Sequence, residues 1–168
     1  HSGGFYLVER KRIGPGGMPP TLHWFKYEAL FTWLSGAALL TVVYYLTGGM
    51  YLVDSSVSAL TPLRATGRGV GTILASWVIY DGPWQSRLAG RSSMATVLSL
   101  AWAAGVTLLF CRTLSGRAAF IHVGAMFGTL MVANVWQRIL PAQQRMIDAT
   151  KAGRMPDYSE SDKAKRRS

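Results

Sequence analysis

Residues 116–138 read GRAAFIHVGAMFGTLMVANVWQR, and this stretch decides the fold. Its uncharged part, residues 118–137, lies between Arg117 and Arg138. At a rise of about 1.5 Å per residue, a helix of that length crosses the hydrocarbon core of a bilayer, which is about 30 Å thick. The stretch therefore predicts a membrane-spanning helix with a basic residue at each end.

The composition of the whole chain favours an integral membrane protein. Hydrophobic residues make up 49% of the 168 residues and charged residues only 15%, whereas soluble domains are about a quarter charged. The net charge is +10, but the basic residues flank apolar runs and do not form one patch. Lys and Arg at the ends of membrane spans explain this pattern better than nucleic-acid binding, so we expect the lipid bilayer as a partner and no nucleic acid.

Three further apolar segments complete the prediction. The uncharged run of the second segment covers only residues 69–80, which is also the length of a re-entrant or interfacial segment. We nevertheless favour a span there, because the basic residues then sort to one side. The expected fold is all-α, an integral membrane helical bundle of about four transmembrane helices. The spans are expected at about residues 27–48, 66–84, 92–111 and 118–139.

The charge distribution predicts the topology. With four spans, fourteen of the 18 Lys and Arg residues lie on the side of the two termini, and the other side holds Arg64, Arg68, Arg112 and Arg117. Positively charged loops stay in the cytoplasm, so both ends of this multi-pass membrane segment are expected there. We divide the chain into a cytoplasmic N-terminal segment with a Pro/Gly linker (1–21), a transmembrane domain (22–140) and a cytoplasmic basic tail (141–168).

His122 is the most informative polar residue of the stretch quoted above. An ionisable group at membrane depth is by default a functional candidate. Gly124 and Gly128 form a GxxxG pattern, which predicts close helix packing, and His122 lies on roughly the opposite face. Three interpretations remain open for His122: an axial haem ligand, a proton relay, or a neutral imidazole hydrogen-bonded to a neighbouring helix.

The other two histidines are weaker candidates for haem or redox-site residues. His23 lies at the cytoplasmic end of the first span among aromatic residues, which is also typical of an interfacial aromatic belt. His122 is expected about 20 Å away across the membrane, so His23 and His122 cannot ligate the same haem iron. His1 could join His23 but not His122. The single cysteine, Cys111, forms no intrachain disulfide and is expected to be a small packing residue.

Four strings resemble a known family. They are HSGGFYLVERKR, LHWFKYEALFTWLSGAALL, SGRAAFIHVGAMFGTLMVANVW and ILPAQQRMIDATKAGRMPD. Together they resemble the membrane domain of the bacterial membrane-bound urate hydroxylases, the urate oxidase N-terminal family. The resemblance extends from His1 to about Asp157 and is weakest across residues 51–93.

The resemblance implies an enzyme that oxidises urate to 5-hydroxyisourate in purine catabolism, in the bacterial inner membrane. Electrons would pass toward a cytochrome c, whose haem would lie on another domain or a partner, because this chain has no CxxCH motif. It also implies further transmembrane helices around this segment, so these 168 residues alone are expected to be a piece that is inactive by itself. Haem b is the cofactor that His122 or His23 would bind. The catalytic and urate-binding residues are not indicated.

Two other kinds of function remain open. One is a non-catalytic membrane module that binds haem, or anchors a partner, and transfers electrons. The other is a small transporter-like bundle in which His122 and Asn134 line a polar path. The sequence has no phosphate-binding loop, no HExxH and no CxxC, so other kinds of enzyme have little support.

Overall fold

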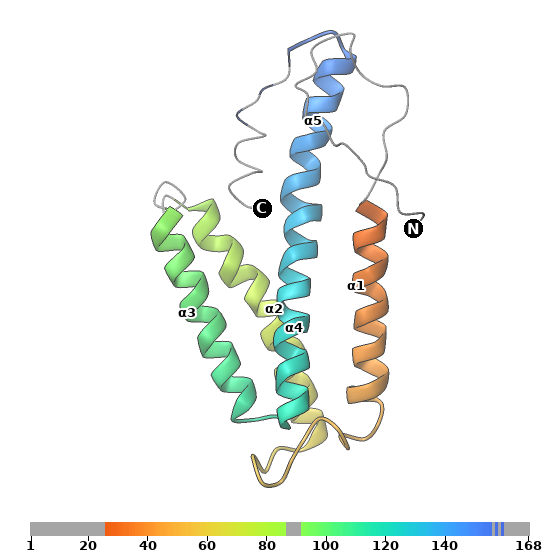
Figure 1. The fold of residues 1–168 in the computed structure, drawn as a ribbon, viewed down its shortest axis with the longest axis vertical. Coiled ribbons are helices and arrows are strands. Elements are labelled where there is room, and N and C mark those ends of the chain that lie inside the picture. Colours follow the sequence, from red (N-terminus) through yellow and green to blue (C-terminus); the bar gives the residue numbers. More distant parts are fainter. Residues whose placement is uncertain (1–25, 87–91, 156, 158, 160–168) are drawn as a thin grey trace, which may run out of the picture. The chain divides into compact units, whose positions relative to one another are not determined.

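The computed structural model describes residues 26–86, 92–155, 157 and 159 (Figure 1). All regular structure in these residues is helical, and no strand occurs among them. The prediction of an all-α fold is therefore confirmed for this part of the chain. The chain divides into two units, residues 25–135 and residues 1–24 with 136–168, and each is described here by itself.

The first unit contains α1 (Lys26–Leu40), α2 (Pro62–Gln85), α3 (Ser92–Cys111) and α4 (Gly116–Asn134). A π-helical turn, Thr41–Tyr45, continues α1. The helices begin where their sequences favour it: Pro62 opens α2 at a position that needs no N–H donor, and the Ser115 hydroxyl accepts the N–H of Ala118 at the start of α4. Helix α2 begins earlier than the expected range of 66–84.

Three helical segments of the described residues are long and apolar enough to cross a membrane. They are Tyr27–Tyr45, Ser93–Cys111 and Gly116–Lys151. Helix α2 is not among them, although it has 24 residues. Arg64, Arg68 and Asp81 lie within it and lower its hydropathy.

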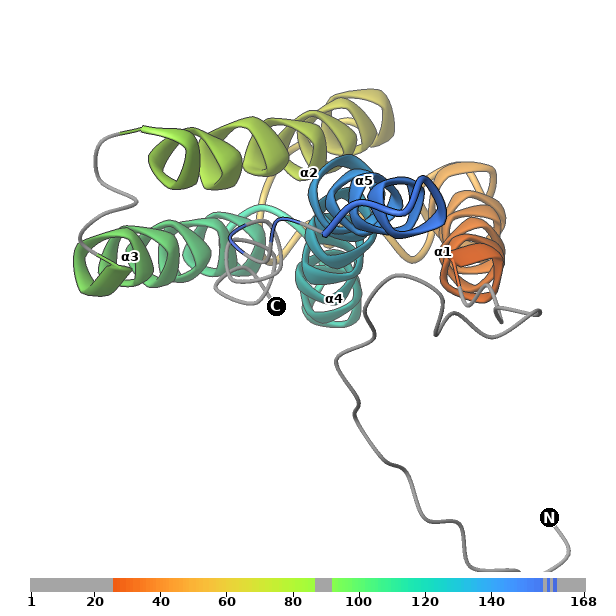
Figure 2. The ribbon, with the colours of Figure 1, turned by 90° about the horizontal axis from the view of Figure 1, so that it is seen from above.

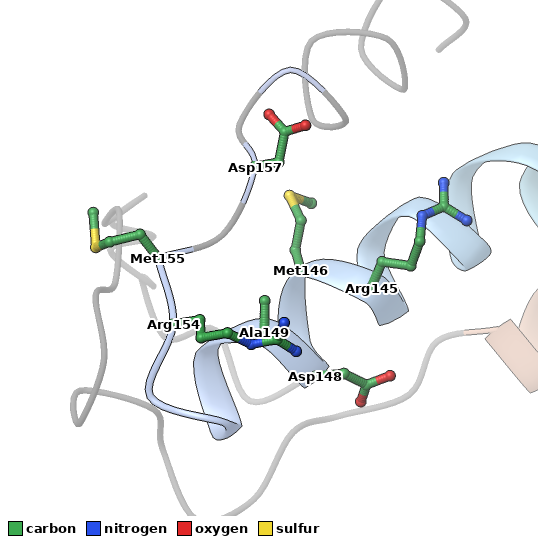
Figure 3. A pocket seen from close by; sticks show the side chains of 7 residues that line it. All are labelled: Arg145, Met146, Asp148, Ala149, Arg154, Met155 and Asp157. Atoms are coloured by element: carbon green, nitrogen blue, oxygen red, sulfur yellow. The ribbon is translucent and has the colours of Figure 1, made fainter.

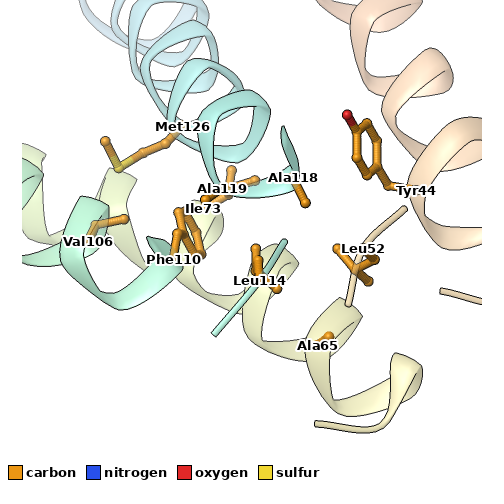
Figure 4. Packing of buried hydrophobic residues seen from close by; sticks show 10 residues of the cluster. All are labelled: Tyr44, Leu52, Ala65, Ile73, Val106, Phe110, Leu114, Ala118, Ala119 and Met126. Atoms are coloured by element: carbon orange, nitrogen blue, oxygen red, sulfur yellow. The ribbon is translucent and has the colours of Figure 1, made fainter. Parts of the chain in front are cut away.

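Helix α4 is the central helix of the first unit. It contacts α1, α2 and α3, and α2 also contacts α3 (Figures 1 and 2). Small side chains on α4, such as Ala118 and Ala119, are buried and allow its neighbours to approach closely. The apolar cluster that joins the four helices is shown in Figure 4; its buried members are Tyr44, Leu52, Ala65, Ile73, Val106, Phe110, Leu114, Ala118, Ala119 and Met126.

The loop between the π-helical turn and α2 is fastened to the turn between α3 and α4. The N–H of Ser115 donates to the carbonyl of Leu52 at 3.0 Å, and its hydroxyl donates to the carbonyl of Tyr51 at 2.6 Å. Gly49 has a φ of 87°, and a Cβ there would lie 2.6 Å from Cγ of Pro62, so the loop needs glycine at this position. These contacts hold one end of the helical unit together.

The second unit contains the remaining described helix. A second π-helical turn, Val135–Ile139, precedes α5 (Leu140–Lys151), with Pro141 in the first turn of α5. Ordered helix therefore extends into the segment that the sequence predicts as a basic tail. Helix α5 ends at Ala152 and Gly153, where the φ of Gly153 is 70°.

Candidate functional site

His122 is completely buried, and both of its ring nitrogens are engaged. Its side chain is 0% exposed. Nδ1 lies 2.7 Å from the carbonyl oxygen of Ala118, and because a carbonyl only accepts, Nδ1 carries the proton. In the neutral imidazole Nε2 is then an acceptor, and the Tyr45 hydroxyl donates to it at 3.0 Å. This is the third interpretation of His122, a neutral imidazole bonded to a neighbouring helix.

Residues from all four helices of the first unit surround the imidazole. The ring centroids of Tyr44, Tyr45 and Phe110 lie 5.8, 5.7 and 5.7 Å from that of His122. On α2, a Cβ added to Gly69 would lie 2.9 Å from Cδ2 and 3.0 Å from Nε2 of His122. Only a glycine fits there without displacement of the ring. Tyr44 and Tyr45 are consecutive, and both reach His122 from the π-helical turn at the end of α1.

The surroundings of His122 do not fit an axial haem ligand. Its Nε2 accepts a hydrogen bond from Tyr45, and α2 approaches so closely at Gly69 that a methyl group would collide with the ring. A porphyrin bound at Nε2 needs an open flat space on that side of the imidazole. Haem ligation by His122 stays a prediction without support from this geometry. His23 and His1, the other candidates, lie outside the described residues.

Helix α4 packs through the face that carries His122, not through its glycines. His122 and Met126 are both 0% exposed. A Cβ added to Gly124 or to Gly128 would have no neighbouring atom within 4 Å. The sequence predicts close packing through Gly124 and Gly128, but within the described residues α4 packs through the opposite face, which carries His122. A packing role of Gly124 and Gly128 stays a prediction for a partner helix.

The glycines of α4 line a groove between α1 and α4, to which α2 also contributes Val70, Ile73 and Leu74. The groove has a volume of about 960 Å³, and no Lys, Arg, Asp or Glu lines it in the part of the chain that the structure describes. Trp33 of α1 donates its Nε1–H to the hydroxyl of Thr129 of α4 at 3.0 Å within the lining. Tyr44 also lines the groove, and its hydroxyl points away from Leu52 in Figure 4. The groove is apolar apart from these few hydroxyl and indole groups.

A second cavity lies in the other unit, beside α5 (Figure 3). Its volume is about 520 Å³, and its lining residues are Arg145, Met146, Asp148, Ala149, Arg154, Met155 and Asp157. A planar anionic purine such as urate would favour arginine together with an aromatic ring for stacking. Its described lining offers both arginine and carboxylate but no aromatic residue, so these residues do not match that requirement.

Other polar groups of the first unit form hydrogen bonds between helices or within one helix. Trp102 of α3 donates its Nε1–H to the hydroxyl of Ser76 of α2 at 3.1 Å, and Ser76 is 0% exposed. The carboxylate of Asp81, which is 6% exposed, accepts from the side-chain amide of Gln85.

Cys111 is exposed, so the expectation that it is a packing residue is wrong. No group of three potential metal ligands occurs among the described residues.

Sequence reasoning identified His122 but missed Tyr45 and Gly69. Tyr45 stands in an apolar run in which tyrosine reads as an interfacial aromatic residue. Gly69 reads as one of several glycines at the start of α2. Their common feature is contact with the imidazole, which no spacing in the sequence indicates.

Comparison with protein families gives one match. The model described as "Urate oxidase N-terminal" matches residues 1–168, which is the whole chain. Comparison with curated proteins and with solved structures finds no match. The resemblance inferred from the four strings is confirmed: the chain belongs to the urate oxidase N-terminal family.

Proposed function

We propose that the chain is the membrane part of an enzyme that oxidises urate to 5-hydroxyisourate in purine breakdown. The observation that carries this proposal is the family match over all 168 residues. The oxidation adds water to urate and releases two electrons and two protons. A one-electron acceptor such as cytochrome c would take up the two electrons in two steps.

A bacterial inner-membrane location with four spans is part of this proposal. Three segments with sufficient length and hydropathy support it. Helix α2 would be the fourth span, since 24 residues extend over about 36 Å. Arg64 and Arg68 lie in its first two turns, where their side chains can reach the headgroup region. Both ends of the chain would then be cytoplasmic, as the positive-inside rule requires.

The residues that bind urate are not assigned. His122 is buried against Tyr45, Gly69 and Phe110, so it would serve as a polar contact inside the helical unit and not as a ligand of substrate. Haem b in the membrane part, a cytochrome c haem on another domain or partner, and further transmembrane helices remain part of the proposal. Haem b rests on the histidines of the apolar segments alone, and the other two rest on the family resemblance alone.

A non-catalytic module that anchors a partner or transfers electrons is the second candidate. The observation that favours it is the engagement of His122 on both nitrogens, which leaves the described residues without an evident reactive group. A transporter-like path through His122 and Asn134 has less support, because neither residue lines the groove between α1 and α4.

The decisive experiment uses the full-length protein in membrane vesicles with oxidised cytochrome c. We expect urate to be consumed and two molecules of cytochrome c to be reduced for each urate. Dithionite reduction provides the control for an intact cytochrome. If the absorbance of urate and that of cytochrome c both stay unchanged while dithionite still reduces the cytochrome, the urate-oxidising function is rejected. The non-catalytic module then remains as the candidate function.

A further inference from the structure

The groove between α1 and α4 has the dimensions of a ligand site. Its volume of about 960 Å³ is at the upper end of the range for small-molecule pockets, which is about 300–1,000 Å³. Along α4 its lining runs from Phe120 to Val132, a length of about 18 Å at the helical rise. Gly36 of α1 and Gly124 and Gly128 of α4 add open space to the groove, because a Cβ at each would meet no atom within 4 Å.

One polar group in the lining is without a partner. Tyr44 is 5% exposed, and among the described residues its hydroxyl has no hydrogen-bond partner, whereas the neighbouring Tyr45 hydroxyl is bound to His122. Tyr44 lines the groove, so its hydroxyl can donate a hydrogen bond to a molecule bound there. Tyr44 lies near the α2 end of α1, so this polar group marks one end of the elongated apolar space.

The lining selects a neutral ligand. Among the residues that the structure describes, no charged side chain lines the groove, so they offer no cation to a phosphate headgroup or to the urate anion. A neutral carbonyl oxygen suits the Tyr44 hydroxyl, and the rings of Trp33 and Phe120 offer aromatic contact. Helices α1 and α4, which supply most of the groove lining, belong to segments apolar enough to cross a membrane, so a ligand would enter from the lipid phase.

We propose that this groove binds a lipid-soluble quinone, with a quinone carbonyl at the Tyr44 hydroxyl and the apolar tail along Gly124 and Gly128. The inference rests on the proposed function in one respect, because urate would be the electron donor. Urate and water give 5-hydroxyisourate, two electrons and two protons, and one quinone takes up all four as it becomes the quinol. Two molecules of oxidised cytochrome c would then take the two electrons of the quinol, which releases two protons and becomes quinone again.

Quinone binding is tested without urate, on the full-length protein in phospholipid nanodiscs with decylubiquinone as the probe. The amount of quinone retained per protein is measured against its concentration. We expect saturable binding by the wild type. Gly128→Leu, which fills the groove, should weaken binding at least about tenfold, and Tyr44→Phe, which removes one hydrogen bond, about fivefold.

Gly105→Leu is the matched control. Gly105 lies on α3, a Cβ there has no neighbour within 4 Å, and the residue does not line the groove. It should therefore bind quinone as the wild type does. Equal affinities of Gly128→Leu and Gly105→Leu would overturn the proposal. So would a lack of saturable binding, or a phospholipid held in the groove that decylubiquinone does not displace.

A second measurement separates this proposal from the urate-oxidising function. With urate added, one quinol should form for each urate consumed, and Gly128→Leu should slow this reaction. If urate still reduces cytochrome c but the wild type binds no quinone, only the quinone site is rejected. If quinone binds with the expected variant pattern but urate is not oxidised, the site stands and the urate-oxidising function is rejected.

Discussion

The Tyr45 hydroxyl lies 3.0 Å from Nε2 of His122, a residue 77 positions further along the chain. The bond fastens the π-helical end of α1 to the first half of α4. It also gives the completely buried imidazole its second hydrogen bond, next to that from Nδ1 to the carbonyl of Ala118. Helix association in a membrane depends on such contacts and on close packing, because lipid tails are as apolar as the side chains they replace.

Removal of the Tyr45 hydroxyl should destabilise the protein. In Tyr45→Phe the acceptor Nε2 of His122 stays buried without a partner, at a cost of about 1–2 kcal/mol. Thermal unfolding in detergent should show a lower midpoint than for the wild type. Tyr44→Phe is the matched control, since its hydroxyl has no partner among the described residues and its loss should leave the midpoint unchanged. Equal effects of the two variants would contradict the role assigned to Tyr45.

Gly69 should tolerate no larger residue. The Cβ of Gly69→Ala would lie 2.9 Å from Cδ2 of His122, so the ring or α2 must move, at a cost of about 1–3 kcal/mol. Gly67→Ala and Gly71→Ala, on the same helix, meet no atom within 4 Å. They should be neutral or slightly stabilising, because alanine favours helix more than glycine does. The ranking of the three unfolding midpoints tests the packing of α2 on His122.

The bond between Trp102 and Ser76 should contribute a smaller amount. Ser76→Ala leaves the Trp102 indole N–H without its acceptor, and interhelical bonds of this kind contribute about 0.6 kcal/mol on average in membranes, with a maximum of about 1.7. Ser99→Ala is the control, because its hydroxyl bonds only the carbonyl of Ala95 in its own helix. A chemical-denaturation series should show a larger loss for Ser76→Ala; the reverse order would refute an interhelical role.

Cys111 provides a test of the proposed topology. It is exposed, and the chain has one cysteine. With both termini in the cytoplasm, the end of α3 lies on the other side, so a membrane-impermeant maleimide should label Cys111 in intact spheroplasts. The double variant Cys111→Ser, Ser159→Cys should be labelled only after the cells are broken. The opposite pattern would mean that the orientation is inverted or that α2 does not span.

Acid should loosen the loop that contains Asp54. The hydroxyl of Ser56 and then its backbone N–H donate to the Asp54 carboxylate and hold its pKa below the usual 3.8. Because the folded pKa is lowered, this contribution is complete above the pKa of the unfolded chain and is lost as the pH falls through the folded pKa. Amide exchange at Ser56 should therefore rise in acid relative to the intrinsic rate. Asp54→Asn should abolish this pH dependence.

Helix α3 shows how far sequence reasoning reaches. Its observed range, Ser92–Cys111, is the expected one, because Arg91 and Arg112 interrupt the uncharged run at both ends. Helix α2 shows where it falls short. Its first turn contains Arg64 outside the uncharged run, and the chain becomes helical earlier because Pro62 is compatible with the first turn of a helix.

The candidate site was predicted in part. A histidine in an apolar stretch is conspicuous, so His122 could be found without a structure. Its partner could not, because Tyr45 resembles any interfacial tyrosine and reaches Nε2 only through the π-helical turn at Thr41–Tyr45. Gly69 is recognised only by the ring that a Cβ would meet.

The sequence by itself determined that the chain forms long apolar helices, where their charged ends lie, and to which family it belongs. Only the tertiary structure decided which side of α4 is buried: the side of His122 and Met126, and not that of Gly124 and Gly128. The physical reason is that α4 is apolar on almost every side, so polarity cannot distinguish an inner from an outer face. The shape of the packing surfaces decides instead. Helices α1, α2 and α3 approach α4 where Ala118 and Ala119 of α4 and Gly69 of α2 leave room for close contact.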